Sequence, residues 1–221
     1  LRSLVACGCD IDGWVLHPSS NKLLRVLALE ECTPSTDMRN LLLLEDSEIE
    51  RFTKSWDGLG RDLGKLVHLR YLGLRGTRIN KLPEEIGSLK FLQALDLVGT
   101  GISRLPRTVC LLTQLVYLLG DRGTTVPDGF LGKVTSLEEL HIHPPTEDEE
   151  YSQQFMQDLG NNQGEMRVLS LRGVVDGFDE SMQSGLVQAL GDLHKLQTLV
   201  LSGDDMYMDK AAQDSWDRAA L

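Results

Sequence analysis

Glu139, His141 and His143 are the residues of this 221-residue chain whose types and spacing come nearest to a chemical site. Alternate residues of a β-strand point to the same face, so a strand here would present one carboxylate and two imidazoles together. Two histidines and a carboxylate are a ligand set for zinc or iron. A flat strand would need a further ligand from a neighbour, and the sequence indicates none. We therefore predict an exposed binding surface here and no metal site.

Motifs of catalysis and of nucleotide binding are missing from the sequence. It contains no Gly-x-Ser-x-Gly nucleophile elbow and no GxxxxGK[ST] phosphate loop. No glycine-rich phosphate fingerprint follows a strand-like segment, and no spacing brings the scattered serine, histidine and aspartate residues together. The sequence predicts no enzyme activity, no catalytic residue and no cofactor in this chain.

The elements that would position these residues come from an internal repeat. Residues 69–86 and 92–109 coincide after a shift of 23, including the Leu-x-x-Leu-x-Leu frame, a Gly-Thr pair and a Leu-Pro pair. A fixed period of this length in this frame is typical of a leucine-rich-repeat solenoid. Each frame predicts a short parallel strand with its leucines inward, followed by a crossover on the other side. The expected fold is an α/β solenoid, a curved horseshoe with parallel strands on its concave face and short 3-10 or α segments and loops on its convex face.

Further frames give about eight repeats, which we interpret as a single leucine-rich-repeat domain over residues 1–221. The frame at Leu1 begins in the middle of a unit, so we expect a fragment of a longer protein. Two intervals, 30–62 and 143–165, break the rhythm. The first is predicted to hold an irregular strand over 40–44 and a helix-rich segment over 49–66, and the second a Pro-kinked acidic loop. Helical spacing over 182–193 predicts a convex helix.

Charge is unevenly placed along the chain. The net charge of −11 argues against nucleic acid as a partner, and no apolar run of about 18 residues predicts a membrane span. Basic residues gather between 65 and 107, whereas residues 141–165 carry six acidic residues and no basic one. Two electrostatically different zones, or solvated repeat edges without a partner, both explain this asymmetry.

Because the four cysteines form no CxxC pair and no Asn-x-Ser/Thr acceptor occurs, we expect a cytoplasmic location.

The repeat frame also selects candidate protein-binding residues on the concave face. Tyrosine and arginine are favoured interface anchors, and the charged residues beside them are selected with them. The alternative is that some of these side chains merely cover the sheet. The selected residues are Tyr71, Arg75, Asp96, Tyr117, Glu139, His141, His143 and Arg172.

One segment, Asp62-Leu-Gly-Lys-Leu-Val-His-Leu-Arg-Tyr-Leu-Gly-Leu-Arg-Gly-Thr-Arg-Ile79, resembles the repeat domain of plant intracellular nucleotide-binding, leucine-rich-repeat immune receptors, especially coiled-coil types from grasses. Residues 82–89 and 193–199 also resemble the repeat domain of these receptors. The resemblance implies a domain that senses a pathogen effector or a guarded host protein and restrains a nucleotide switch module. The switch module itself is absent from this chain.

We predict that a basic strip would dock the receptor's own nucleotide-binding module. The strip consists of Lys65, Arg70, Arg78, Lys81, Lys90, Arg104 and Arg107. The alternative is a constitutive signalling scaffold of the small-GTPase-binding type, which shares the Leu-Pro-x-x-Ile pattern. Its units usually carry asparagine where this chain has Thr77 and Thr100.

Overall fold

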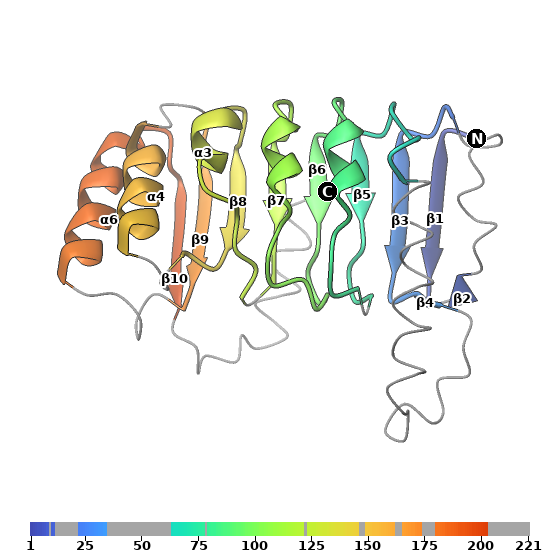
Figure 1. Ribbon diagram of the computed structural model, residues 1–221, viewed down its shortest axis with the longest axis horizontal. Helices are drawn as coiled ribbons and strands as arrows, with labels where there is room; N and C mark the ends of the chain where they lie inside the picture. The colour runs from blue at the N-terminus through green and yellow to red at the C-terminus, as the bar shows by residue number, and fades with distance from the viewer. Residues whose placement is uncertain are drawn as a thin grey trace, which may run out of the picture.

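The computed structural model describes residues 1–8, 10–11, 22–34, 63–77, 79–121, 123–145, 149–161, 165–173 and 180–202. Within these ranges, eight strands form one open parallel sheet in chain order (Figure 1). A second sheet pairs the short strands β2 (Asp10–Ile11) and β4 (Thr33–Pro34). The strands of the main sheet are β1 (Ser3–Cys7), β3 (Val26–Glu30), β5 (Tyr71–Gly73), β6 (Ala94–Asp96), β7 (Tyr117–Leu119), β8 (Glu139–Ile142), β9 (Val168–Arg172) and β10 (Thr198–Ser202).

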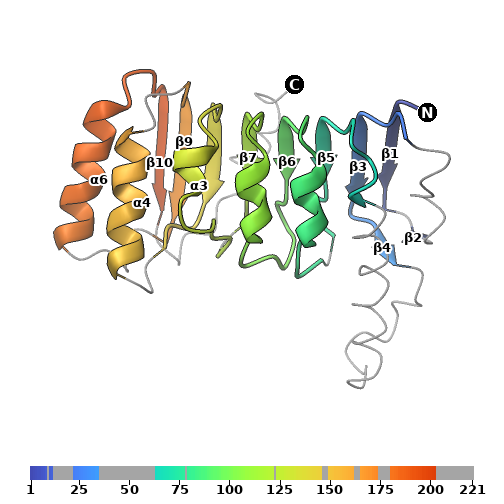
Figure 2. The same ribbon diagram turned by 45° about the horizontal axis from the view of Figure 1, so that its top comes forward.

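The helical crossovers lie on one side of this sheet (Figures 1 and 2). They are the 3-10 turns η2 (Glu84–Ser88) and η3 (Arg107–Leu111) and the helices α3 (Phe130–Lys133), α4 (Glu149–Asn161) and α6 (Glu180–Asp192). We call the opposite sheet surface the open face. The predicted α/β leucine-rich-repeat solenoid, with parallel strands and convex helical segments, is therefore confirmed.

A continuous row of leucines forms the core beneath the sheet. The strand register aligns the same frame position from β3 to β9, and each leucine in the row is at most 1% exposed. Parallel strands covered by crossovers bury such rows because each unit alone has too little apolar surface. The row consists of Leu27, Leu72, Leu95, Leu118, Leu140 and Leu169.

The Gly-Thr pair of each short repeat closes the turn after its strand. Gly76 and Gly99 have φ values of 66° and 73°, in the left-handed region where glycine has no steric penalty. The next residue, Thr77 or Thr100, is buried and donates its hydroxyl to the carbonyl of Leu74 or Leu97, at 2.6 and 2.7 Å. The same carbonyls also accept the backbone N–H of Thr77 or Thr100, at 3.1 and 3.2 Å, so each threonine closes its turn with two hydrogen bonds and leaves no buried hydroxyl unsatisfied.

The two predicted irregular intervals have different outcomes. Strand β3 pairs directly with β5, Val26 opposite Tyr71, while the predicted strand at 40–44 and most of the predicted helix at 49–66 lie outside the described residues. The interval 143–165, expected to be irregular, contains the regular 13-residue helix α4. Glutamates at its start favour a helix N-terminus, and Phe155 and Leu159 are buried in the core. The predicted helix over 182–193 is α6, within two residues at its start.

Candidate protein-binding face

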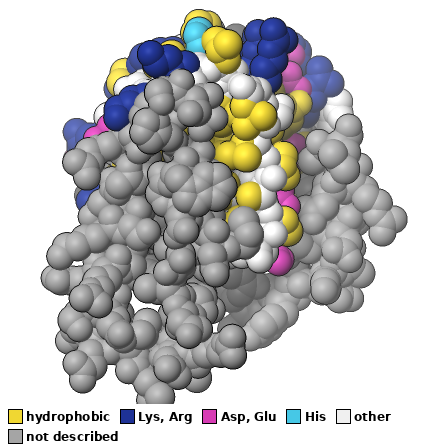
Figure 3. All heavy atoms as spheres, turned by 90° about the vertical axis from the view of Figure 1, so that its right-hand side faces the viewer, with side chains coloured by type: hydrophobic (Ala, Val, Ile, Leu, Met, Phe, Trp, Pro, Cys, Tyr) yellow, Lys and Arg dark blue, Asp and Glu magenta, His cyan; other side chains and the backbone are white. Residues whose placement is uncertain are grey.

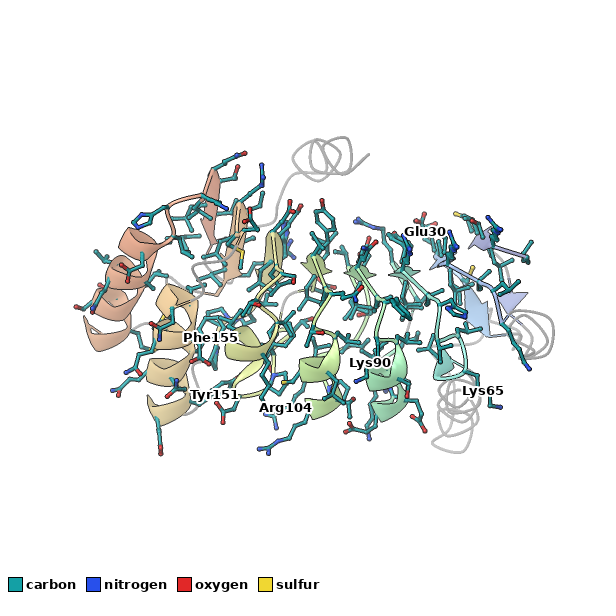
Figure 4. The ribbon with its side chains drawn as sticks, turned by 90° about the horizontal axis from the view of Figure 1, so that it is seen from above. Glu30, Lys65, Lys90, Arg104, Tyr151 and Phe155 are labelled. Carbon is teal, nitrogen blue, oxygen red and sulfur yellow. The ribbon has the colours of Figure 1, made fainter. Side chains whose placement is uncertain are left out.

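Strand register brings most of the sequence-selected residues onto the open face. Tyr71, Tyr117 and Glu139 belong to one row of register partners across β5 to β8. Asp96 and His141 belong to a second row on the same face, two residues farther along each strand. Tyr117 is the most exposed of the five. The described helices cover the other side of the sheet, and none of them lies over this face (Figure 4).

Tyr71 lies flat over the backbone of its own strand because Gly73 has no side chain. A Cβ atom on Gly73 would lie 2.8 Å from both Cε1 and Oη of Tyr71, closer than real contacts allow. Burial raises the pKa of the Tyr71 phenol, and the carboxylates of Asp96 and Glu30 raise it further. Tyr71 therefore keeps its proton at neutral pH and presents a hydroxyl donor. The sequence alone does not reveal that Gly73 makes room for the ring.

Asp96 holds Arg75 in place on the open face. The Nε and Nη2 atoms of Arg75 each lie 3.0 Å from Oδ2 of Asp96, and Oδ1 of Asp96 accepts the backbone N–H of Val98 at 3.1 Å. Asp96 is only 5% exposed. The residue that we selected as a contact is therefore a buried support, and the accessible partner in this pair is the guanidinium of Arg75.

Glu139, His141 and His143 do not converge on one point. Nε2 of His141 lies 2.8 Å from Oε1 of Glu139, and His141 is 7% exposed. His143 follows the end of β8, its backbone N–H donates to the carbonyl of Thr124, and its side chain lines a cleft at the strand-end edge. In the described part of the chain, no group of three or more His, Cys, Asp or Glu residues is arranged to hold a metal ion.

Arg172 reaches past β8 toward the end of β7. Its Nη1 atom lies 3.8 Å from Oδ1 of Asp121, whose other oxygen accepts the backbone N–H of Gly99 at 3.0 Å. Asp121 is not among the residues that the sequence selected. Its role follows from the register of β7 and β9, which flank β8 in the sheet.

The cleft at the strand-end edge has a volume of about 890 Å³ and lies between the crossovers of β6 to β8 and helix α4. Arg104, Arg107 and His143 line it opposite Asp128 and Tyr151. The Tyr151 hydroxyl donates to the carbonyl of Val126, and burial, with Asp128 next in effect, raises the pKa of Tyr151 to about 12. Tyr151 thus ties the start of α4 to the preceding repeat.

Three residues of the basic strip do not share the open face. Lys65, Lys90 and Arg104 lie on the crossover side, whereas Glu30 lies toward the strands (Figure 4). Lys90 Nζ lies 3.5 Å from the carbonyl of Leu111 in η3. Arg104 and Arg75 therefore lie on opposite sides of the molecule. Of the other members, Arg70 precedes β5, Lys81 precedes the Leu82-Pro83 pair, Arg107 begins η3, and Arg78 lies outside the described residues.

A family model described as a leucine-rich repeat region matches residues 1–220. This chain belongs to the leucine-rich-repeat family. Membership agrees with the parallel sheet and its buried leucine row, and leucine-rich-repeat domains are in general protein-interaction domains. The comparison with curated protein sequences found no match.

Solved leucine-rich-repeat structures are similar to the chain in fold. One is a leucine-rich-repeat protein of Leptospira interrogans, with a TM-score of 0.50, 18% identity, and coverage of 84% of this chain and 50% of that protein. This leucine-rich-repeat chain thus spans half the length of that relative. The ectodomain of the receptor kinase SOBIR1 from Arabidopsis thaliana has a TM-score of 0.37 and 21% identity, and the match covers 64% of this chain and 61% of that ectodomain. An internalin of Listeria monocytogenes has a TM-score of 0.40 and 16% identity, and the match covers 97% of this chain and 84% of that protein.

A search of the described residues found no helix with the length and apolarity that a membrane crossing requires.

Proposed function

We propose that this chain is the protein-recognition and autoinhibitory leucine-rich-repeat region of a cytoplasmic plant immune receptor. The single observation that supports recognition best is the open face itself, where no described helix lies above Tyr71, Arg75 and Tyr117. Tyr71 lies in β5 and Arg75 just after it, and Tyr117 lies in β7, one strand beyond β6. Tyrosine and arginine anchors on a rigid sheet lose little conformational entropy on binding. The plant assignment is supported by the resemblance of residues 62–79 to receptors of that class.

The proposed mechanism is competition between two partners. In the resting receptor the repeat region binds the nucleotide-binding module, and a pathogen effector or guarded host protein binds the open face. A ligand shifts such an equilibrium only by its difference in affinity for the two states. The effector must therefore bind better when the nucleotide-binding module is released.

Recognition is tested by Tyr117→Ala in the chain carried within its full-length receptor. We expect at least about tenfold weaker capture of the matching effector or guarded protein, as for an aromatic hot spot. Val187→Ala is the control, because Val187 is even more exposed than Tyr117, at 71% against 41%, but lies on α6, on the crossover side. Equal losses for both variants would remove recognition from the open face. Binding of a small GTPase with no affinity for any nucleotide-binding module would instead support the scaffold alternative.

Autoinhibition is tested separately on the two sides of the molecule, by Arg75→Glu and by Arg104→Glu. If the basic strip docks the nucleotide-binding module, Arg104→Glu should cause spontaneous signalling in plant tissue. If the open face does so, Arg75→Glu should have that effect instead. Unchanged basal signalling in both variants would contradict the autoinhibitory role.

A further inference from the structure

Three arginines stack in register along the edge where the first strands begin. Arg2, Arg25 and Arg70 each precede the first residue of β1, β3 or β5, and the backbone N–H of Arg25 donates to the Arg2 carbonyl at 2.7 Å. The N–H of Arg70 donates to the Arg25 carbonyl at 2.7 Å in the same way. We call these three residues the arginine ladder. Neighbouring strands lie about 4.8 Å apart, so three like charges are held close together, which by itself is unfavourable.

No carboxylate among the described residues pairs with the arginine ladder, and all three arginines are exposed. The same edge is neutralised farther along the chain. Arg167, in the equivalent position before β9, lies 3.5 Å from Glu138, which precedes β8. In another row of this edge, Lys195 pairs with Glu165. The fold therefore supplies counter-ions at one end of this edge and leaves positive charge uncompensated at the other, in a chain of net charge −11.

An exposed apolar row runs beside the arginine ladder. Leu23, His68 and Phe91 each lie three residues before the start of β3, β5 or β6, so register places them next to one another. The rings of His68 and Phe91 are stacked with centroids 6.2 Å apart and an interplanar angle of 24°. Leu23 is 64% and Phe91 46% exposed. Figure 3 shows basic side chains around hydrophobic and histidine side chains at this edge. Exposed apolar groups gathered in this way mark interaction surfaces.

We propose that the arginine ladder and the Leu23–His68–Phe91 row together dock an acidic amphipathic helix of a partner protein. A helix advances about 5.4 Å per turn, close to the strand spacing of about 4.8 Å. A helix lying across the strand starts would therefore place one carboxylate per turn beside each arginine over three strands. Its adjacent apolar stripe would cover the apolar row.

The overall charge favours a short helix over an extended anionic surface. A membrane or a nucleic acid would bring many negative charges near the acidic remainder of the chain, whose net charge is −11. A helix of three or four turns meets only the local positive edge, within about one Debye length. This inference does not use the open face, and Arg70 is the one residue that it shares with the basic strip.

The test uses a fluorescent synthetic helical peptide of about 15 residues, with glutamates at i, i+4, i+7 and i+11 and leucines beside them. Its anisotropy is titrated with the 221-residue chain, against a peptide of the same composition in scrambled order. We expect saturable binding of the patterned peptide only. The double variant Arg25→Glu with Arg70→Glu should weaken it by about tenfold or more, and Phe91→Ser by severalfold.

Arg167→Glu is the matched control, since it has the same residue type in the same row but lies at the neutralised end. The affinity of Arg167→Glu for the patterned peptide should stay within about twofold of that of the unchanged chain. Tyr117→Ala should also leave peptide binding intact. Circular dichroism and the urea midpoint verify folding, and Arg25→Ala with Arg70→Ala replaces the reversal if that variant unfolds. Equal binding of the scrambled peptide, equal loss in Arg167→Glu, or tighter binding to phosphatidylserine vesicles or duplex DNA would overturn the proposal.

Discussion

From β5 to β7 the chain returns to the sheet through five-residue 3-10 turns, whereas beyond β8 it returns through the 13-residue helices α4 and α6. In the short repeats a proline in extended conformation precedes each 3-10 turn, and a buried threonine earlier in the repeat donates its hydroxyl to the carbonyl of a core leucine just after the strand. In the long repeats the helices satisfy their own backbone, with Ser152 donating to the Pro145 carbonyl at 2.7 Å. The leucine row continues unchanged through both regions. The sheet therefore requires a filled core beneath it and accepts more than one way of filling it.

The two regions also pack their crossovers together differently. Gly87 in η2 approaches η3 very closely. A Cβ atom added to Gly87 would lie 2.9 Å from the carbonyl oxygen of Thr108 and 2.7 Å from the Cβ atom of Thr108. Gly160 in α4 approaches α6 less tightly, with a Cβ position 3.2 Å from Cα of Ala189. A short turn has no freedom to shift, because its strand is only a few residues away on each side. Two long helices have more room to adjust.

The largest expected effect comes from cutting the leucine row in the short region. Leu95→Ala should lower the free energy of unfolding by about 2–5 kcal/mol. Leu95 is 1% exposed, so removal of its side chain leaves a cavity in the core. Leu199 occupies the same register row at the end of the long region and is 40% exposed. Leu199→Ala should therefore cost about 1 kcal/mol. Urea unfolding measures both, and equal losses would contradict the described difference in burial.

A medium effect should separate the two glycines. Gly87→Ala should destabilise the chain by about 1–3 kcal/mol, since the added methyl group would lie against the Cβ and the backbone carbonyl oxygen of Thr108. Gly160→Ala should be close to neutral, because alanine is favoured over glycine in a helix interior by about 1 kcal/mol and this gain offsets the tighter packing. Thermal and urea unfolding of both variants check the order. A reversed order would show that the short region is the more adaptable one.

The smallest effect concerns the junction between the regions, where Tyr151 bonds to the Val126 carbonyl. Its pKa is raised from 10.0 to about 12, so the folded state holds this proton more tightly than the unfolded chain does. The contribution to stability is complete below pH 10 and is lost as the pH rises through 12. We expect the urea midpoint of the unchanged chain to fall more steeply between pH 10 and 12 than that of Tyr151→Phe. Parallel curves would remove Tyr151 as the titrating group.

Local periodicity predicted the strands well, because the frame around Leu72 and Leu95 repeats at a constant interval. It did not predict α4, since the two prolines and the acidic run before it are also typical of a loop. Burial of Asp96 and His141 could not be read from the frame, because it depends on which side chains meet across neighbouring strands or along one strand. The side on which a basic residue lies could not be predicted for a similar reason. Arg75, just after β5, pairs with Asp96 on the open face, whereas Lys90, just after η2, lies on the crossover side (Figure 4).

The direct pairing of β3 with β5 has a consequence for how such proteins diversify. Many residues separate these strands in sequence, yet Val26 and Tyr71 are partnered as regularly as Tyr71 and Ala94. Loop-closure entropy grows only logarithmically, by about 0.6 kcal/mol for each doubling of length. An insertion between two units therefore adds new surface at little thermodynamic expense while the hydrogen-bond ladder stays in phase. Evolution can therefore change the number of residues between two paired strands, and protein engineers have the same freedom at this position.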